Sequence, residues 1–586
     1  MHTLDLNTLI QRLHLQSCDL SHQLDPVSGG LISYVRKQHN GHATLGTGSQ
    51  TAEPNATGEY IATQGYLYIA QRLQLASSKA YENEFSLDNA IKATNFLIKS
   101  QHPSGLIDLC SANYESAPDT AFIIQAIAHL LNHGAAWRND DNEWNVLCEH
   151  IETFIRRAVP GLVSGGFHTP NHRWVISGAL ALALKLVPDI SNPESASSLI
   201  DTLLSEGIDI DSEGAYTEHS IGVYDAICNS SFFALHTHYP NSHKAGVLAA
   251  VIKNLSFDQH LLNSDGTADT SLSKRQDYGS KSIPLGLSAS YLQAAHISPE
   301  HSEAFSKTAH FIWNNAALAH PLSHTIFDLN RLVNALFIKQ NDTQPPIVLT
   351  KPQLADFAEL FPTNRFWRTR QGAMTASVFA DRSQLLNLNY HTAELAGIKI
   401  NQAYFGAGKF VGDTIDGDAN GVTLTSNGQH TPRRPGYDYA LGPTAAKATW
   451  DDTFHARPLR EVSPASGSLS IQVPNEGLGL DLNYKTTGET QNVATQVAFD
   501  FAPGGIWETD HLSFVPDAGQ VIFLKEGSAR MRYGIDIIEI SGGAHSHTMW
   551  AMRDSETAPN HVRILITFQT PVDHSIQLRC YRSNSQ

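Results

Sequence analysis

The chain has 586 residues and a formal net charge of −17, from 40 basic and 57 acidic side chains. This length exceeds what one hydrophobic core supports, so two or more domains are expected. The negative charge argues against nucleic acid as a partner and repels polyanions at long range. An acidic substrate would therefore need a local basic pocket, which suits a short oligosaccharide better than a long polymer.

Targeting and redox signals are sparse. No apolar run reaches membrane-spanning length, so no membrane partner is expected. The start of the chain lacks a basic region followed by an apolar one, which predicts a cytoplasmic protein, or a periplasmic or secreted one whose signal was removed. The cysteines are few, odd in number and scattered, which argues against a disulfide framework and against a cysteine metal site: Cys18, Cys110, Cys148, Cys228 and Cys580.

Helical periodicity repeats from about residue 55 to about residue 340, with turn-forming clusters between the segments. This pattern predicts paired helices packed in a ring or solenoid. The predicted helices are 59–75, 88–100, 118–132, 142–157, 173–186, 195–204, 220–236, 243–254, 285–295, 299–316 and 328–339.

After about residue 352 short alternating and β-branched segments appear, which predict an antiparallel β-sandwich. They are 374–380, 384–390, 397–403, 469–473, 480–484, 493–499, 519–524, 535–540, 562–568 and 575–581. Residues 412–421 resemble a calcium loop but lack its final glutamate, so we interpret them as an ordinary loop. The domains are therefore expected at 1–350 and 351–586.

A polar stretch runs into the apolar helix near residue 173. Pro170 suits a first helical turn, where its missing N–H costs nothing. Asn171 and His172 would then lie at the helix N-terminus, where free N–H groups favour an anion. Together with Arg173 and Trp174 they could grip a carboxylate, although a simple helix cap remains the alternative.

Three further stretches carry more polar groups than folding requires. The first holds Tyr114 and Asp119 before an apolar helix. The second holds Glu218 and His219, and if Ser220 opens a helix, Tyr224 lies one turn along it. In the third, strand alternation puts Asn387, Asn389 and His391 on one face and Leu388 and Tyr390 on the other, as a wall of a polar cleft would need.

The order of these motifs, an Asn-His pair at 171–172, Tyr224, then His391 at the start of the sheet, resembles the heparinase II/III-like polysaccharide lyases and the related oligo-alginate lyases. The resemblance implies an N-terminal (α/α) toroid of helical hairpins followed by a C-terminal antiparallel β-sandwich, a multidomain α+β fold. It also implies that Asn171, His172, Tyr224 and His391 are the catalytic residues.

The chemistry of uronate elimination explains why such groups are needed. The C5 proton is weakly acidic beside a charged carboxylate, so amide and imidazolium donors must neutralise that charge. A tyrosine, mostly neutral at pH 7, is a natural acid for the leaving oxygen at C4. Tyr224 would be acid and base in a syn elimination, whereas His172 would be the base in an anti elimination, and the sequence leaves both open.

Basic residues are expected to shape subsites for further uronates, with solvated loops as the alternative. They are Arg365 and Arg368 near the domain junction and Arg433 in the β-region. No cofactor is expected for the chemistry. The histidine pair with which many of these lyases hold a structural metal is missing, so a Zn or Ca site stays open, with Glu394, Asp413, His430 and His455 as candidates.

The sequence therefore predicts an enzyme that cleaves a bond 4-linked to a uronic acid by β-elimination and leaves a C4–C5 unsaturated uronate, acting on the ends of acidic oligosaccharides. A homodimer is left open. One alternative is a toroidal glycoside hydrolase acting on uronyl oligosaccharides, with Asp119 and either Glu218 or Asp225 as its two carboxylates. The other is a non-catalytic carbohydrate-binding protein.

Overall fold

A computed structural model describes most of the chain. The described residues are 4–32, 51–81, 86–109, 112–240, 243–318, 325–339, 354–403, 408–428, 437–439, 449–450, 459–461, 466–552 and 555–583. They form two compact units, Met1–Leu262 with Gly266–Leu354, and Asn263–Asp265 with Ala355–Gln586. The division after Leu354 lies close to the boundary of 350/351 predicted from the sequence.

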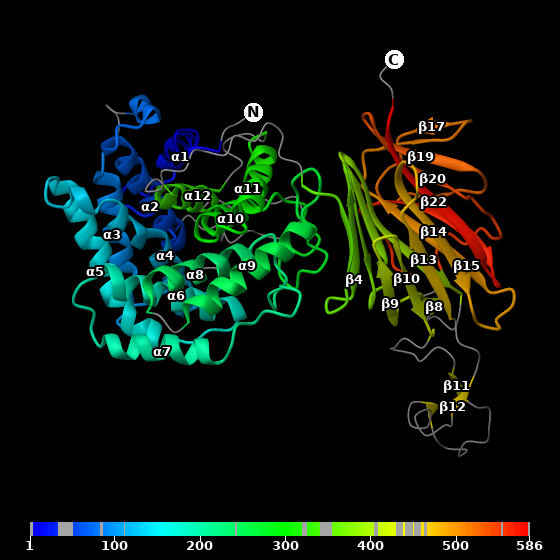
Figure 1. Cartoon of the computed structure of the whole chain (residues 1–586), viewed down its shortest axis with the longest axis horizontal. Coiled ribbons are helices and arrows are strands. Elements are labelled where there is room, and N and C mark those ends of the chain that lie inside the picture. Colours follow the sequence, from blue (N-terminus) through cyan, green and yellow to red (C-terminus); the bar gives the residue numbers. More distant parts are fainter. Residues whose placement is uncertain are drawn as a thin grey trace. The chain divides into compact units, whose positions relative to one another are not determined.

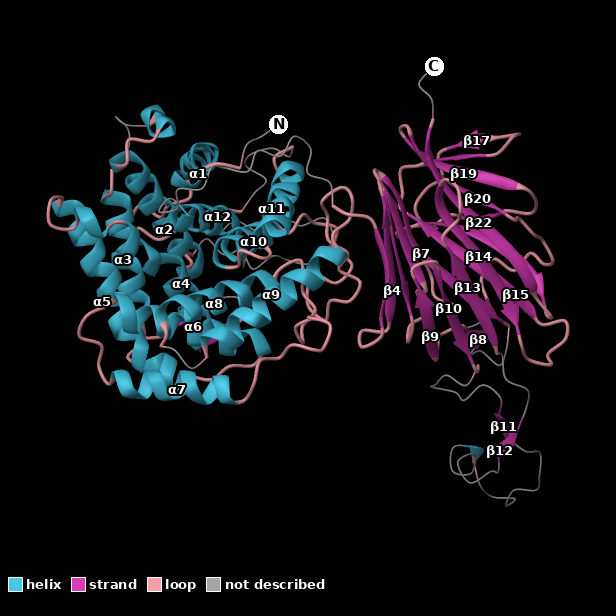
Figure 2. Cartoon of the chain, viewed as in Figure 1, coloured by secondary structure: helices cyan, strands magenta, loops and turns pink. Residues whose placement is uncertain are grey.

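The first unit is helical, and its coiled ribbons run from blue to green in Figure 1 and are cyan in Figure 2. Its long helices are α1 (Leu6–Ser21), α2 (Pro54–Arg72), α3 (Asp88–Ser100), α4 (Ala117–His133), α5 (Asn142–Ser164), α6 (Pro170–Leu186), α7 (Pro193–Ser205), α8 (Tyr224–His238), α9 (Lys244–Leu261), α10 (Leu285–Ile297), α11 (Ser302–Ala316) and α12 (Ile326–Lys339). Short 3₁₀ turns lie at Ala76–Ala80 and Ala135–Trp137.

The even-numbered helices close a ring. Each packs on the next, from α2 through α4, α6, α8 and α10 to α12, and α12 packs back on α2. The remaining helices lie outside it: α1 on α2 and α12, α3 on α2, α5 on α4, α7 on α6, α9 on α8, and α11 on α10. The expected toroid of helical hairpins is therefore present in the described residues.

The inner helices run in the same direction. Gln125 in the middle of α4 donates to the Val175 carbonyl of α6 and to Ser231 of α8, each at 2.9 Å. Near the helix starts, Asn55 of α2 donates to Asp119 of α4 at 3.0 Å. Contacts that join two helix starts, or two helix ends such as those at His129 of α4 and His238 of α8, require parallel helices, so these N-termini share one end of the ring.

The other half of the ring follows the same rule. Asn330 of α12 donates to Glu59 of α2 at 2.8 Å, again near both helix starts. A Cβ on Gly286 of α10 would lie 3.0 Å from Asp328 Oδ1 of α12 and 3.2 Å from the Ala226 Cβ of α8. All six inner helices therefore begin at the same end of the ring.

Differences from the predicted helices are local. The sequence reading missed α1 and also the hairpin β1 (Ile107–Leu109) and β2 (Asn113–Ser116). Helix α8 begins at Tyr224 rather than at Ser220, so Tyr224 is its first residue and not one turn inside it. Among the described residues, no helix combines the length and apolarity that crossing a bilayer requires.

The second unit consists of strands, drawn from yellow-green to red in Figure 1. The strands are β3 (Phe357–Phe361), β4 (Phe366–Gln371), β5 (Met374–Phe379), β6 (Leu386–Tyr390), β7 (Ala393–Gln402), β8 (Gly408–Lys409), β9 (Thr414–Asp418), β10 (Gly421–Ser426), β11 (Tyr437–Tyr439), β12 (Leu459–Glu461), β13 (Gly467–Gln472), β14 (Leu478–Thr486), β15 (Ala494–Phe501), β16 (Ile506–Glu508), β17 (Ser513–Phe514), β18 (Val521–Phe523), β19 (Ser528–Tyr533), β20 (Asp536–Ser541), β21 (Val562–Gln569) and β22 (Asp573–Arg582).

Two large sheets form the predicted sandwich. One has the order β18-β21-β15-β7-β6-β5-β4-β3, with β8 beside β7, and the other β17-β16-β19-β20-β22-β14-β13-β10-β9. Described neighbours in the two sheets pair antiparallel except β18 and β21, which are parallel. A shared core holds side chains of both sheets, such as Leu388 of β6 and Leu482 of β14.

The interpretation of residues 412–421 as a loop was wrong. Strand β9 pairs with β10 as a hairpin, with Gly421 opposite Asp418. The alternation was hidden because β9 has acidic residues and glycine where a half-buried strand would have apolar ones, and its side chains are mostly exposed.

Candidate active site

The start of α6 places the predicted Asn-His pair. Thr169 occupies the N-cap position with extended backbone, and Pro170 is the first helical residue, as its missing N–H allows. Asn171 is fully buried and His172 is 8% exposed. Both therefore lie at the helix end where unpaired backbone N–H groups create a positive potential.

Asn171 is bound to Glu218. Its Nδ2 donates to both carboxylate oxygens of Glu218, at 3.0 and 2.8 Å, and lies 3.2 Å from Thr169 Oγ1. Its Oδ1 is buried without a hydrogen-bond partner. The amide hydrogens predicted to face a substrate carboxylate are thus engaged by a protein carboxylate in this structure.

Glu218 is buried and links Asn171, at the start of α6, to Arg275, in the loop between α9 and α10. It is 5% exposed, and Arg275 Nη1 lies 3.1 Å from its Oε1. Burial raises the pKa of Glu218, while the bond from Asn171 and the charge of Arg275 oppose that rise. Its carboxylate orients an amide and a guanidinium, which is a different role from the direct substrate binding predicted for it.

Tyr224 receives contacts from a loop between α9 and α10. Gln276 Nε2 donates to the phenol oxygen at 2.8 Å. The guanidinium of Arg275 lies 4.5 Å from the ring centroid, within range of a cation–π contact. Because the phenol oxygen accepts from Gln276, the phenol hydrogen remains free to be donated elsewhere, as an acid requires.

His172 is neutral near pH 7. Burial and then the neighbouring His168 lower its pKa to about 4, although Asp119 opposes the shift. The two rings meet edge to face with centroids 4.7 Å apart, and His172 Nδ1 is buried without a partner. A neutral imidazole suits a general base and does not supply the imidazolium donor that the sequence reading allowed.

His219 has a strained backbone. Its φ of 52° lies in the left-handed region, which is uncommon for a residue with a side chain. Its Nδ1 lies 3.1 Å from the Thr217 carbonyl oxygen, and the ring is half-buried beside Glu218 in the chain. Such strain is concentrated at functional sites, which keeps His219 among the candidate residues.

Tyr114 and Asp119 differ in what they can offer a ligand. Tyr114 is 74% exposed, with its ring 4.8 Å from that of His102. Asp119 is 6% exposed and accepts hydrogen bonds from Asn55 and Asn113, each at 3.0 Å, and from the N-cap residue Ser116. Tyr114 is accessible for stacking, whereas Asp119 is occupied in joining α2 to α4.

Arg173 and Trp174 have structural partners instead of an open site. Arg173 pairs with Glu206 at 2.7 Å and with Asp209, and its guanidinium lies 4.7 Å from the Trp174 ring. Trp174 is 1% exposed. Their predicted substrate contacts are not favoured, because Arg173 pairs with carboxylates that follow α7 and Trp174 packs on Phe232 of α8, with ring centroids 5.0 Å apart.

In the second unit His391 occupies the two-residue turn between β6 and β7, with φ of 48° at its first central position. Glycine normally takes that position in a type II′ turn, so His391 is strained. Burial, then Arg582, lowers its pKa. Leu388 and Tyr390 belong to the sandwich core, so Asn389 lies on the opposite, polar face as alternation predicted.

The predicted arginines of the junction are engaged within the second unit. Arg368 lies in β4, is fully buried and donates to Ser377 and, at 2.8 Å, to Asn263. Arg365 donates to the Asp413 carbonyl at 2.6 Å and pairs with Asp381. Arg368 is therefore unsuited to the predicted substrate contact, and Arg433 lies outside the described residues.

The metal prediction stays a prediction. His430 and His455 lie outside the described residues. Glu394 lies in β7, and Asp413 accepts from the Asn427 backbone at 2.5 Å. Within the described part of the chain, no group of three or more His, Cys, Asp and Glu side chains is arranged to hold a metal ion.

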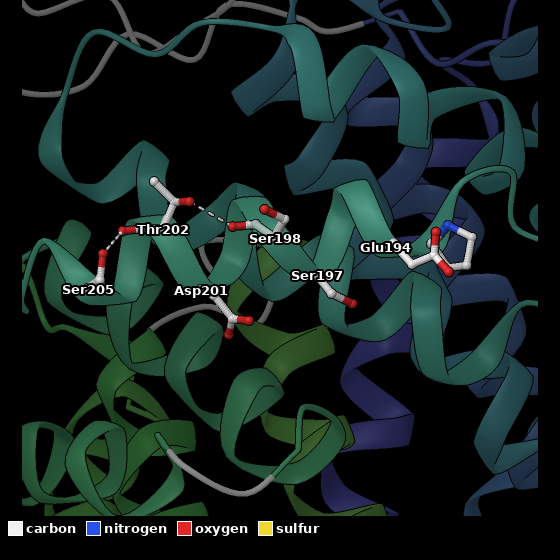
Figure 3. A pocket seen from close by; sticks show the side chains of 7 residues that line it. Glu194, Ser197, Ser198, Asp201, Thr202 and Ser205 are labelled. Atoms are coloured by element: carbon white, nitrogen blue, oxygen red, sulfur yellow. Dashed lines mark hydrogen bonds between the residues drawn. The ribbon is translucent and has the colours of Figure 1, made fainter.

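A hollow along α7 lies apart from these residues. Glu194, Asp201 and several hydroxyl side chains line it, and all of its lining residues belong to that one helix (Figure 3). Thr202 and Ser205 donate to backbone carbonyls of α7 itself. This surface carries none of the groups that the chemistry needs.

The sequence did not predict Arg275 and Gln276, which contact Glu218 and Tyr224, or Asp277, which accepts a hydrogen bond from Ser220 before α8. Their loop has neither helical nor strand periodicity, and it lies far along the chain from Asn171. A run of consecutive charged and amide residues is in itself an ordinary solvated loop. Only the fold reveals that its side chains reach Tyr224 and Glu218.

No protein-family model and no curated protein matches this chain. Among solved structures it is similar to heparan sulfate lyase HepC from Pedobacter heparinus, with a TM-score of 0.49 and 9% identity over 99% of this chain and 88% of that one. It is also similar to chondroitin AC lyase from Streptomyces coelicolor A3, solved with chondroitin sulphate, with a TM-score of 0.43 and 14% identity over 99% and 80%.

A chondroitinase AC lyase solved with oligosaccharides has a TM-score of 0.45 and 9% identity, over 98% of this chain and 83% of that one. These structures are of heparan sulfate and chondroitin lyases. All of these TM-scores are below 0.5.

Proposed function

We propose that this protein is a polysaccharide lyase that cleaves the bond 4-linked to a uronic acid by β-elimination. The observation that carries the proposal is the environment of Tyr224, whose phenol oxygen accepts from Gln276 at 2.8 Å while Arg275 lies over its ring. A phenol held in this way has its hydrogen free for a leaving oxygen. The nearby guanidinium stabilises the phenolate that forms as the proton leaves.

The remaining groups fit the other demands of the reaction. The substrate carboxylate and the enolate-like intermediate need positive partners, which Arg275 and the start of α6 supply. The neutral His172 is able to take the C5 proton in an anti elimination, and Tyr224 itself would do so in a syn elimination. The C5 configuration of the preferred sugar decides between these two routes.

The direction of the inner helices favours an acidic ligand. Six helix N-termini share one end of the ring, and each carries a partial positive charge. That local potential opposes the long-range repulsion from a net charge of −17. Because the attraction is local, short oligosaccharides attacked from one end are the favoured substrates over long polymers.

A glycoside hydrolase is less well supported. It needs two carboxyl groups facing the scissile bond. Asp119, Glu218 and Asp225 are 6%, 5% and 3% exposed. Asp119 and Glu218 are each held by neighbouring amide donors, so these candidates do not present a free pair to a substrate.

The decisive experiment screens acidic polysaccharides and their oligomers for the ultraviolet absorbance of a C4–C5 alkene conjugated to the carboxylate. The wild-type protein is expected to generate that signal, and Tyr224→Phe to lose it while remaining folded. Tyr291→Phe is the matched control, because Tyr291 is a buried tyrosine whose hydroxyl donates to the Leu255 carbonyl at 2.7 Å.

Cleavage without the absorbance would indicate a hydrolase. Binding without cleavage, retained in Tyr224→Phe and in His391→Ala, would indicate a carbohydrate-binding protein. Following product lengths with time tests the mode of action, because attack at chain ends releases one small product from the beginning.

A further inference from the structure

Hydrogen bonds hold two segments of the helical unit side by side at the site. One is the approach to α8, residues 217–224, and the other is the loop at 273–277 between α9 and α10. Their backbones meet where Lys274 N donates to the Glu218 carbonyl at 3.0 Å. Lys274 Nζ also donates to the Thr217 carbonyl at 3.1 Å. The two segments therefore move as one piece or lose these contacts together.

Asp277 is the hub of this connection. Its Oδ1 accepts from Ser220 Oγ at 2.9 Å and from Ser273 Oγ at 2.5 Å, and its Oδ2 accepts from the Gly222 backbone at 3.0 Å. The side chain is 6% exposed. One buried carboxylate thus satisfies donors from both segments, which is the arrangement that makes a hydrogen-bonded charge strong and directional.

The approach to α8 is shaped around this carboxylate. A Cβ on Gly222 would lie 2.7 Å from Asp277 Oδ2, so only glycine lets the backbone come this close. Ser220 Oγ, which donates to Asp277, also accepts from the Tyr224 backbone N–H at 3.2 Å. Asp277 is therefore linked to Tyr224, the first residue of α8, through the single hydroxyl of Ser220.

The residues next to Asp277 in the loop are those that contact the phenol. Arg275 lies over the Tyr224 ring and Gln276 donates to its oxygen. Ser273, bound to Asp277, also accepts from the Arg275 backbone N–H at 3.1 Å. Holding Asp277 thus fixes the backbone on both sides of the arginine and the glutamine.

Neighbouring carboxyl groups lack this role. Asp225 and Asp258 are 3% and 0% exposed, and oxygens of both have no donor. Burial raises the pKa of each; the charges of Asp277 and Glu218 raise the pKa of Asp225 further, and Asp225 raises that of Asp258. Higher pKa values favour the uncharged form of both carboxyl groups, whereas Asp277 accepts hydrogen bonds from both segments and is their anchor.

We propose that Asp277 is a positioning residue that holds Arg275 and Gln276 against Tyr224. The proposal rests on the proposed function for its kinetic consequence only, because the contact between loop and phenol exists without substrate. Loss of the hub lets the loop move by an ångström or so, and misplacement of that size lowers turnover by up to about 100-fold. Binding changes less, because the carbohydrate-facing groups remain.

The test compares Asp277→Asn with Asp141→Asn. Asp141 is the control because it also accepts three bonds, from Tyr68 at 2.8 Å and from the Glu143 and Trp144 backbones at 3.0 and 3.1 Å, but it caps α5. In Asp277→Asn one donor meets an amide hydrogen instead of an acceptor. We expect kcat to fall about 10- to 100-fold with KM changed less than about threefold, and Asp141→Asn to keep its kcat.

A readout without substrate separates this proposal from the proposed function. In protein labelled at the tyrosine Cζ, the NMR signal that Tyr224→Phe removes is expected to shift in Asp277→Asn and stay in place in Asp141→Asn. If the wild type cleaves no uronate polymer, the proposed function fails while the NMR shift still supports the positioning role.

An unmoved Tyr224 signal together with unchanged kcat would overturn the proposal. If Asp277→Asn does not fold, Ser273→Ala is a milder test of the same proposal. It removes one hydrogen-bond donor to Asp277 and the acceptor of the Arg275 backbone N–H. A Tyr224 signal that shifts in Ser273→Ala supports the proposal, and one that stays in place contradicts it.

Discussion

The two ends of the inner helix ring hold buried or half-buried histidines in different surroundings. His172 lies at the N-terminal end of α6, and burial lowers its pKa to about 4. His129 and His238 lie towards the C-terminal ends of α4 and α8, with centroids 6.4 Å apart, and burial lowers their pKa values to about 3 and about 4. A lowered pKa is thus common to both ends.

What differs is the surroundings. His133, beside His129, packs on Tyr66 and Phe337 and is hydrogen-bonded to Asn334 at 2.8 Å. The N-terminal end instead holds the ion pair of Glu218 with Arg275, the strained backbone of His219 and a partnerless imidazole nitrogen on His172. Burial alone therefore does not mark a site, whereas polar groups left to be satisfied by a ligand do.

Among variants that test this difference between the two ends, Arg275→Met is expected to lower kcat/KM the most. Loss of a charge that acts on the developing phenolate and enolate should lower kcat/KM about 100- to 1,000-fold. Arg173→Met is the matched control, because Arg173 also forms an ion pair and lies 4.7 Å from an aromatic ring. Equal losses in both variants, measured by the alkene absorbance, would show that general destabilisation is responsible.

Glu218→Gln is expected to have a smaller effect. The amide can still accept from Asn171 but no longer holds Arg275 by charge, so kcat should fall about tenfold. Glu152→Gln is the control, since Glu152 is 4% exposed and pairs with Arg138 away from the site. A Glu218→Gln enzyme with wild-type kcat would contradict the orienting role.

The smallest expected effect is on stability in acid. It should be similar for the histidines at both ends of the helix ring. Between pH 6.5 and about 4 the unfolded chain protonates His172 while the native chain does not, so the free energy of unfolding falls as the pH drops. His172→Gln and His129→Gln should each remove part of that fall in urea titrations. Only His172→Gln should also alter the pH dependence of turnover. An altered pH dependence of turnover in His129→Gln would contradict the difference drawn between the two ends.

Most of the fold could be predicted because the periodicity is strong. The helix at Asp88–Ser100 was predicted to the residue, and the shift from helices to strands was placed within a few residues of Leu354. Failures occurred where local signals were weak, as in the polar hairpin of β9. Helix closure between α12 and α2 could not be predicted, because sequence periodicity carries no information on which distant faces meet.

The site was predictable only in part, for a similar reason. Asn171 stands at a helix start, which leaves a recognisable pattern, whereas the start of α8 at Tyr224 was predicted one turn too early. Arg275 and Asp277 act through tertiary contacts of a loop without one. Burial of Trp174 and Arg368 was equally unpredictable, because the local sequence pattern does not show which way a single polar or aromatic side chain points.

Closure of the ring by its first and last helices has a consequence for biosynthesis. Arg12 of α1 donates to the Ala317 carbonyl at 3.1 Å, and Asn330 of α12 reaches back to Glu59 of α2. A ribosome must therefore release some three hundred residues before the circle can shut, and contacts so distant along the chain assemble slowly. Nascent chains that stop short of α12 should be recognised by chaperones as unfinished.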